Sequence, residues 1–428
     1  MKRIIRSIAG CAVCWAAVLA VCFGLLCAAA AVPVSAIRDH LLSSSDKLAV
    51  HAPHEKTINS LYSSTCDNYA DAVLLGIAAS MTPENPVRSA LNTRYYDDDY
   101  GPAVGIRAIL NGAEPNRDYT RYWHGSLVFV RPLLAVTDLT GIRIAGSVLL
   151  CLLLAADSGW LICRKHNAAA VFLLVSAALI HLPFVFTTVE YQSVFLIVLA
   201  VLPLYVRFAE EPRTLVILSA GVGTLTAFLD FLTAETLTLL VPLTMAFFIH
   251  AEKGVLPDEK KSLLQTIACG AAWAGGYLLT FAAKWAAASA VLGHSVTGTA
   301  LQAAGERMTG SSEGISTPVG MIFFAWGANL SRLVPTAEQI SIAGMLCWAG
   351  LFACVCILLY RSDTRTHNLP RAAMLLIAAI PFVRFAVLRN HSCLHDFFTY
   401  RALMSSIMAL LGLMWYRVGT RVRRTKRA

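Results

Sequence analysis

A short polar segment near the end of the chain, NHSCLHDFFTYR at residues 390–401, contains side chains that could do chemistry. His391 and His395 are four residues apart, the spacing of two metal ligands on one helical face, but no third ligand is evident. Together with Arg401 they could instead hold a phosphate or diphosphate through charge-assisted hydrogen bonds. The segment could also be structural, with polar groups that pair with acids elsewhere and tie helices together. The anion site and the structural tie both stay open.

A second group of candidates lies in SSTCDNYADAVLLGIAAS, where Ser64 and Asp67 indicate the start of a helix. Asp67 and Asp71 are four residues apart, so both should face the same side of that helix. Asp67 could simply cap the helix. Asp71 extends a stripe that is otherwise apolar, so it should be paired, hydrogen-bonded or functional. Either carboxylate, in a partly apolar site, could act as a general base.

Two further segments carry charges among aromatic residues. NTRYYDDDYGP holds three adjacent acids, Asp97, Asp98 and Asp99. Such a run usually marks a solvated turn, but it could bind a divalent cation through oxygen ligands. In RYWHG the aromatic residues could belong to a belt at the lipid headgroups. Arg121 and His124 in the same stretch would suit an anionic phosphate.

The composition decides where these residues can sit. The chain has 428 residues, of which 57% are hydrophobic and only 14% charged, and its mean hydropathy is +0.62. Soluble domains carry about 25% charged residues, so this is an integral membrane protein. The net charge of +9 comes from short basic loops and a basic tail, which argues against a nucleic-acid partner. Most of the 12 cysteines lie in apolar runs, but Cys66 and Cys393 fall in polar loops and could form a disulfide.

The apolar runs predict an all-α polytopic membrane protein with about ten transmembrane helices, since one crossing takes about 20 apolar residues. Residues 1–31 form the N-terminus and a first anchor, and 32–141 form a large, mostly helical outer loop. Residues 142–417 form a nine-helix bundle with a further outer loop at 291–340, and 418–428 form a basic tail. The nine spans are predicted at 142–163, two within 168–206, two within 214–250, 263–290, 341–360, 371–389 and 402–417. Residues 318–330 are too short to span and could be a re-entrant or interfacial helix.

The basic loops set the orientation. RKHN, RFAEEPR and HAEKGVLPDEKK should be cytoplasmic, together with both termini, by the positive-inside rule. The outer face then carries Glu190 in TTVEYQ, and Asp230 and Glu235 in LDFLTAET. It also carries the 32–141 loop and the 390–401 segment. Nearly all the unusual polar residues therefore share one face, and ionisable groups at a membrane face are functional candidates.

This layout resembles the C-type (GT-C) superfamily of membrane glycosyltransferases. Those enzymes share a cytoplasmic N-terminus, one anchor, a large first outer loop with short helices, and many further spans. The phrases DNYADAVLLGIA, RYWHGSLVFVRPLL, FLDFLTAETLTLLVPL and NHSCLHDFFTYR also look like those of a group of uncharacterised bacterial multi-pass membrane proteins. The resemblance implies an enzyme of the bacterial plasma membrane. It would move a sugar from a polyprenyl-phosphate donor to an envelope glycan or protein acceptor, with the catalytic acid in the first outer loop.

Under that resemblance, Asp71 or Asp67 would be the base, and His391, His395, Arg401, Arg121 or His124 would bind the phosphate. Glu190, Asp230 and Glu235 would support the outer face, and a divalent cation could bind Asp97 to Asp99. An alternative function is a transporter or flippase for a lipid-linked or anionic solute, which would favour internal repeats and ionisable groups at the midplane. No convincing repeat is found. A second alternative is a non-catalytic membrane assembly protein.

Overall fold

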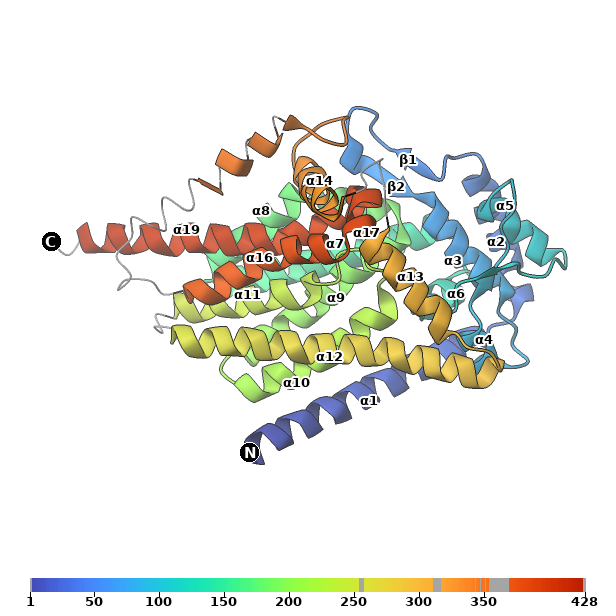
Figure 1. Ribbon diagram of the computed structural model, residues 1–428, viewed down its shortest axis with the longest axis horizontal. Helices are drawn as coiled ribbons and strands as arrows, with labels where there is room; N and C mark the ends of the chain where they lie inside the picture. Colours follow the sequence, from blue (N-terminus) through green and yellow to red (C-terminus); the bar gives the residue numbers. More distant parts are fainter. Residues whose placement is uncertain are drawn as a thin grey trace.

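The computed structural model describes residues 2–253, 258–310, 317–342, 344–346, 348–350, 352–353 and 369–425. Long helices run side by side, and the segment 32–141 lies at one end of this bundle (Figure 1). The first helix begins, and the last helix ends, at the opposite end (Figure 1). The part of the chain that the structure describes is mostly helical, as the sequence predicts.

Six helical stretches among the described residues are long and apolar enough to cross a membrane, by length and composition. They are α1 (Lys2–Ala30), α7 (Leu139–Cys163), α9 (Val189–Arg207), α10 (Pro212–Leu229), α12 (Glu259–Leu292) and the run Asp396–Tyr416, which includes most of α19 (Met404–Thr425). Three shorter helices lie at other predicted spans: α8 (Asn167–Leu179), α11 (Leu237–Glu252) and α16 (Arg371–Val387). Half of the predicted span at 341–360 falls outside the described residues, so the count of ten stays a prediction.

Helix α11 is the centre of the bundle, because nearly all of its residues are buried. It packs against α9 and α19, whereas α10 lies between α1 and α12. Helices α10 and α12 approach very closely at two glycines. A Cβ on Gly223 would collide with the Trp273 carbonyl, and a Cβ on Gly276 with the Ala220 carbonyl. Small residues at these positions let the two backbones touch.

The 32–141 segment, here called the outer insert, is built from short helices and two small antiparallel strand pairs. Its elements are α2 (Val34–Ala49), β1 (His54–Lys56), η1 (Tyr62–Ser64), β2 (Thr65–Asp67), α3 (Asn68–Ser80), α4 (Pro86–Leu91), β3 (Arg94–Tyr95), α5 (Pro102–Leu110), β4 (Arg117–Asp118) and α6 (Leu127–Leu133). Strand β1 pairs with β2 in a register that sets His54 opposite Asp67. Buried side chains such as Ile37, Leu41 and Leu75 give the insert a core of its own, which continues into α1.

The remaining described elements close the bundle at the insert end. They are η2 (Leu182–Thr187), α13 (Thr297–Thr309), α14 (Pro318–Ser331), α17 (Arg389–Leu394), α18 (Asp396–Thr399) and η4 (Tyr400–Leu403). The segment predicted to be re-entrant or interfacial is α14, which packs on α16 and α17. Cys66 and Cys393 do not form a disulfide. The Cys66 thiol donates to the Glu55 carbonyl at 3.2 Å, and the Cys393 thiol to the Met321 carbonyl at 3.5 Å.

Candidate active site

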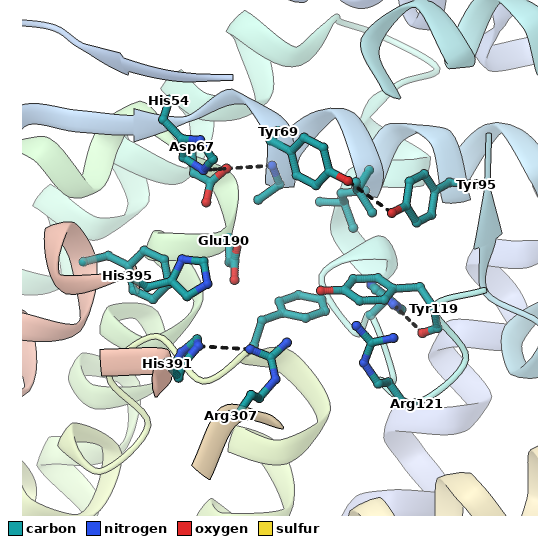
Figure 2. A pocket seen from close by; sticks show the side chains of 16 residues that line it. His54, Asp67, Tyr69, Tyr95, Tyr119, Arg121, Glu190, Arg307, His391 and His395 are labelled. Carbon is teal, nitrogen blue, oxygen red and sulfur yellow. Dashed lines mark hydrogen bonds and ion pairs between the residues drawn. The ribbon is translucent and has the colours of Figure 1, made fainter. Parts of the chain in front are cut away.

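A cavity of about 350 Å³ lies between the outer insert and the bundle (Figure 2). Its walls come from β1, β2, α3, β3, the first turn of α9, α13, α17, α18 and nearby loops. Most lining side chains are charged or aromatic: His54, Asp67, Tyr69, Tyr95, Tyr119, Arg121, His124, Glu190, Phe231, Arg307, His391, His395 and Phe398. Ala70, Val73 and Leu74 complete the lining. The cavity thus combines residues from five separate regions of the sequence.

Six of the residues predicted from the sequence meet in this cavity. They are Asp67, Arg121, His124, Glu190, His391 and His395. The cluster in NHSCLHDFFTYR is therefore one wall of a cavity shared with the outer insert. Besides contacting its own helices, the cluster faces residues of the outer insert across the cavity.

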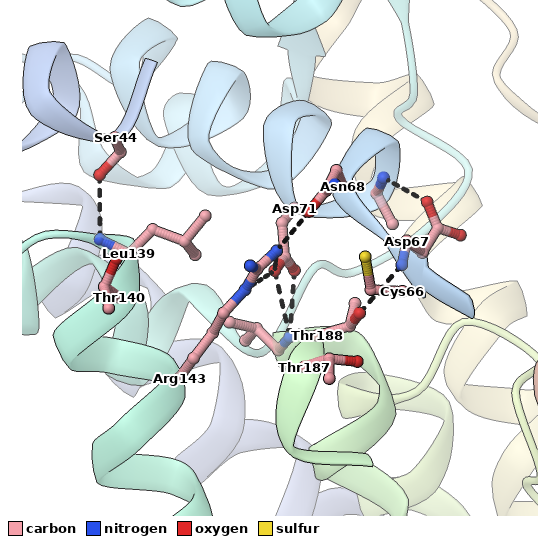
Figure 3. Close-up of polar contacts among 12 residues, drawn as sticks. Ser44, Cys66, Asp67, Asn68, Asp71, Leu139, Thr140, Arg143, Thr187 and Thr188 are labelled. Carbon is pink, nitrogen blue, oxygen red and sulfur yellow. Dashed lines mark hydrogen bonds and ion pairs between the residues drawn. The ribbon is translucent and has the colours of Figure 1, made fainter. Parts of the chain in front are cut away.

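The start of α3 is held against the start of α9 by a polar network beside the cavity (Figure 3). The Asp67 backbone N–H donates to Thr188 Oγ1 at 3.0 Å, and the Val189 N–H donates to Asp71 Oδ1 at 3.1 Å. Asp71 also forms an ion pair with Arg143 at 2.7 Å, and its side chain is fully buried. The network fixes Glu190, which follows Val189, beside Asp67. Asp71 is a docking residue in this structure and lies outside the cavity.

Two carboxylates face the cavity, and their surroundings differ. Asp67 caps α3, because its Oδ1 accepts a hydrogen bond from the Ala70 N–H at 2.8 Å. The same oxygen lies 3.5 Å from His54 Nε2. The Glu190 side chain, by contrast, makes no hydrogen bond or ion pair with any residue that the structure describes. A carboxylate left without a partner in a cavity is a candidate for substrate binding or proton transfer.

The opposite side of the cavity is cationic (Figure 2). Arg307 donates from its guanidinium to His391 Nδ1 at 3.0 Å, while His391 Nε2 donates to the Leu232 carbonyl at 2.9 Å. This pairing defines a neutral His391 that orients Arg307. The Arg121 guanidinium stacks 4.3 Å from the centre of the Tyr119 ring. Neither arginine forms an ion pair with a carboxylate of the described residues, so both are available to an anion.

The histidines of the cavity differ in the direction in which their pKa values are shifted. Burial lowers the pKa of His124 to about 3 and that of His395 to about 4, and it holds the pKa of His391 well below its usual value. All three are neutral near pH 7. The hydrogen bond to Asp67 raises the pKa of His54, against the opposing effect of burial. An anion in the cavity would therefore be held mainly by Arg121 and Arg307.

His54 and Arg307 were missed by the sequence analysis. His54 lies in the polar opening of the outer insert, and its only signal is its position near CDNYAD. Arg307 lies in α13, within the outer loop predicted at 291–340. It is one of few charged residues in that loop. Nothing local distinguishes either side chain from a solvated surface group.

The other predicted site residues lie outside the cavity. Glu235 forms an ion pair with Arg384 at 3.0 Å, and Asp230 accepts hydrogen bonds from its own turn, including the Leu232 N–H at 2.9 Å. Arg401 is buried against the Tyr191 ring, 4.6 Å from its centre. Glu235 thus joins the segment before α11 to α16, Asp230 stabilises its own turn, and Arg401 packs on α9.

The acidic run is also outside the cavity. Asp97 accepts a hydrogen bond from the Tyr69 hydroxyl at 3.2 Å, and Asp98 from the Tyr100 N–H at 2.9 Å. Asp99 is exposed. No group of three or more His, Cys, Asp or Glu side chains that could hold a metal occurs in the part of the chain that the structure describes. The run therefore has the contacts of a turn.

A second, apolar cavity of about 380 Å³ lies next to the first along α9. Its walls come from α6, α7, α9 and α10, and include Phe129, Leu149, Leu196 and Leu225. Val189 lines this cavity and directly precedes Glu190, which lines the polar one. An apolar space thus begins one residue from the unpaired carboxylate.

No protein-family model, no curated protein and no solved structure matches this chain.

Proposed function

We propose that the protein is a membrane glycosyltransferase that uses a polyprenyl-phosphate-linked sugar as its donor. One observation carries the proposal: a single cavity where the outer insert meets the bundle combines two carboxylates, Asp67 and Glu190, with two arginines, Arg121 and Arg307, that form no ion pair with a carboxylate of the described residues. Transfer of a sugar from a lipid phosphate needs a base for the acceptor and cations for the leaving group. It also needs an apolar place for the lipid chain, for which the α6–α7–α9–α10 cavity is the candidate.

In this proposal Asp67 takes the proton from the acceptor hydroxyl as its oxygen attacks the anomeric carbon of the sugar. The bond between that carbon and the phosphate oxygen breaks, and its electron pair leaves with the polyprenyl phosphate. Attack from the opposite face inverts the anomeric centre. Arg121 and Arg307 stabilise the charge that develops on the phosphate, and His391 holds Arg307 in position. Glu190 accepts a hydrogen bond from a sugar or acceptor hydroxyl.

This assignment replaces Asp71, which the sequence favoured as the base, by Asp67. Asp71 is fully buried in its ion pair with Arg143 and has no access to the cavity. No step is assigned to a metal ion. The transporter and assembly alternatives remain hypotheses that the following experiment separates from transfer.

The test is release of polyprenyl phosphate by the purified full-length protein in lipid nanodiscs, supplied with a panel of polyprenyl-phosphate-linked sugars and envelope acceptors. Asp67→Asn should lower the release rate by about 10²–10⁴-fold, the usual contribution of a general base. Asparagine is as good a helix cap as aspartate, so this variant should fold normally. Asp98→Asn, an exposed acid on the same insert, is the matched control and should keep full activity.

Two results would contradict the proposal. Wild-type protein that moves lipid-linked sugar between leaflets without cleaving it would be a transporter. An Asp67→Asn variant with full release would remove Asp67 as the base, and a loss only in Glu190→Gln would assign that role to Glu190.

A further inference from the structure

A second pair of cavities lies between α1, α10 and α12, toward the end of the bundle that holds the basic loops. One cavity is apolar and measures about 610 Å³, with walls that include Ile8, Ala220, Ala271 and Gly275. The other measures about 510 Å³ and is lined by Arg6, Ser7, Pro212, Arg213, Val216 and Gln265. Ser7 and Val216 line both, so the two form one continuous groove with an apolar part and a basic mouth.

The groove exists because α1 diverges from α12 (Figure 1). The indole N–H of Trp15 donates to Thr280 Oγ1 at 3.1 Å, which joins the two helices near the middle of α1. From there toward the N-terminus they separate, and α10 forms the floor of the gap. The walls carry mostly alanine and glycine, so no side chain of the described residues fills the space. Apolar cavities of this kind do not hold water, so in a bilayer a hydrocarbon chain would occupy it.

The mouth of the groove is positively charged. Arg6 and Arg213 both line it, and Arg213 donates to the Arg6 carbonyl at 3.1 Å, which keeps the two residues together. Among the residues that the structure describes, no aspartate or glutamate lines either part of the groove. A basic mouth beside an apolar slot is complementary to an anionic headgroup with its acyl chain.

We propose that this groove binds one anionic phospholipid of the leaflet at the basic end of the bundle. The phosphate lies between Arg6 and Arg213, and an acyl chain lies along Ala271 and Gly275. This site is separate from the proposed glycosyltransferase cavity and does not depend on it. A bound lipid there would fill the gap between the anchor helix and the bundle.

The experiment is native mass spectrometry of the full-length protein with phosphatidylglycerol and phosphatidylcholine of identical acyl chains. Wild-type protein should retain phosphatidylglycerol preferentially. The Arg6→Gln/Arg213→Gln double variant should retain about 25-fold less, at about five-fold for each basic residue. The Arg164→Gln/Lys260→Gln double variant loses two positive charges outside the groove. It should retain phosphatidylglycerol as well as wild type does.

The apolar part is tested by Gly275→Phe, because no atom of the described residues lies within 4 Å of a Cβ on Gly275 and the ring would enter the groove. Gly270→Phe on the same helix has equal space but does not line the groove, so it is the control. Gly275→Phe should lose the preference for phosphatidylglycerol, and Gly270→Phe should keep it. Equal retention of both lipids by wild type, or unchanged retention in the double variant, would overturn the proposal. A wild-type dimer that dissociates on the Gly275→Phe substitution would also overturn the proposal, because a second copy of the protein would then fill the groove.

Discussion

Asp67 and Glu190 lie in one cavity, but their partners give them different properties. Asp67 accepts a hydrogen bond from the Ala70 N–H and lies 3.5 Å from His54, whereas Glu190 has no such partner among the described residues. These two contacts hold the Asp67 side chain at the cavity wall, in the position that a base needs before the acceptor arrives.

At the scale of single residues, the interaction between His54 and Asp67 predicts that the stability of the folded protein depends on pH. The pKa of His54 is raised above 6.5 because protonated His54 interacts favourably with Asp67. This stabilisation of the folded protein is fully present below pH 6.5, the pKa of His54 in the unfolded chain. It is lost as the pH rises through the pKa of His54 in the folded protein. The melting temperature of wild type should thus exceed that of His54→Gln most at about pH 6 and least at about pH 9. His294→Gln, at an exposed position, should show no such trend; a constant gap for His54→Gln would exclude the ion pair.

At the scale of elements, the cavity depends on how α3 docks on α9. The Asp71–Arg143 pair and the Val189 N–H hold the two helix starts together (Figure 3). Asp71→Asn leaves Arg143, whose side chain is only 22% exposed, without its counter-ion. We expect a loss of about 3 kcal/mol in unfolding free energy, the low end for a broken buried pair.

Thermal unfolding of purified Asp71→Asn, Arg143→Gln and the double variant measures this loss. The double variant should be less destabilised than the sum of the single changes, because the pair is already broken in each. Folded Asp71→Asn protein should keep its transfer activity. A stable but inactive Asp71→Asn variant would return Asp71 to the role of base.

The contact between α10 and α12 makes a second prediction at this scale. A methyl group on Gly276 would meet the Ala220 carbonyl, which is backbone and cannot move aside cheaply. Gly276→Ala should destabilise the protein by about 1–3 kcal/mol, the usual cost of overpacking. Gly270→Ala on the same helix meets no atom within 4 Å and should be neutral. Equal melting temperatures for the two variants would show that the helices do not touch there.

At the scale of the whole molecule, α1 begins and α19 ends at one end of the bundle, and the outer insert lies at the other (Figure 1). This arrangement agrees with an even number of crossings and, by the positive-inside rule, predicts cytoplasmic termini. A green fluorescent protein fused after Thr425 should fluoresce in bacteria. An alkaline phosphatase inserted at Tyr100, which is 79% exposed, should be active. The reverse pattern would invert the orientation and place the cavity on the cytoplasmic side.

The sequence by itself determined the class of protein and most of the helices. Apolar runs of membrane-crossing length are local properties, so α1, α7, α9 and α12 lie where hydropathy predicts them. The sequence also identified candidate site residues, because ionisable side chains at a membrane face are unusual. Six of those residues meet in one cavity.

Only the tertiary structure decided which of them face that cavity. Asp67 and Asp71 are one helical turn apart and look alike in sequence. Their positions differ because Arg143 and Val189, both far along the chain, contact and bury Asp71, whereas Asp67 stays at the cavity. Arg307 and His54 enter the site for the same reason. Their partners, His391 and Asp67, come from other elements. A local sequence pattern cannot predict a contact between segments that are far apart in the chain.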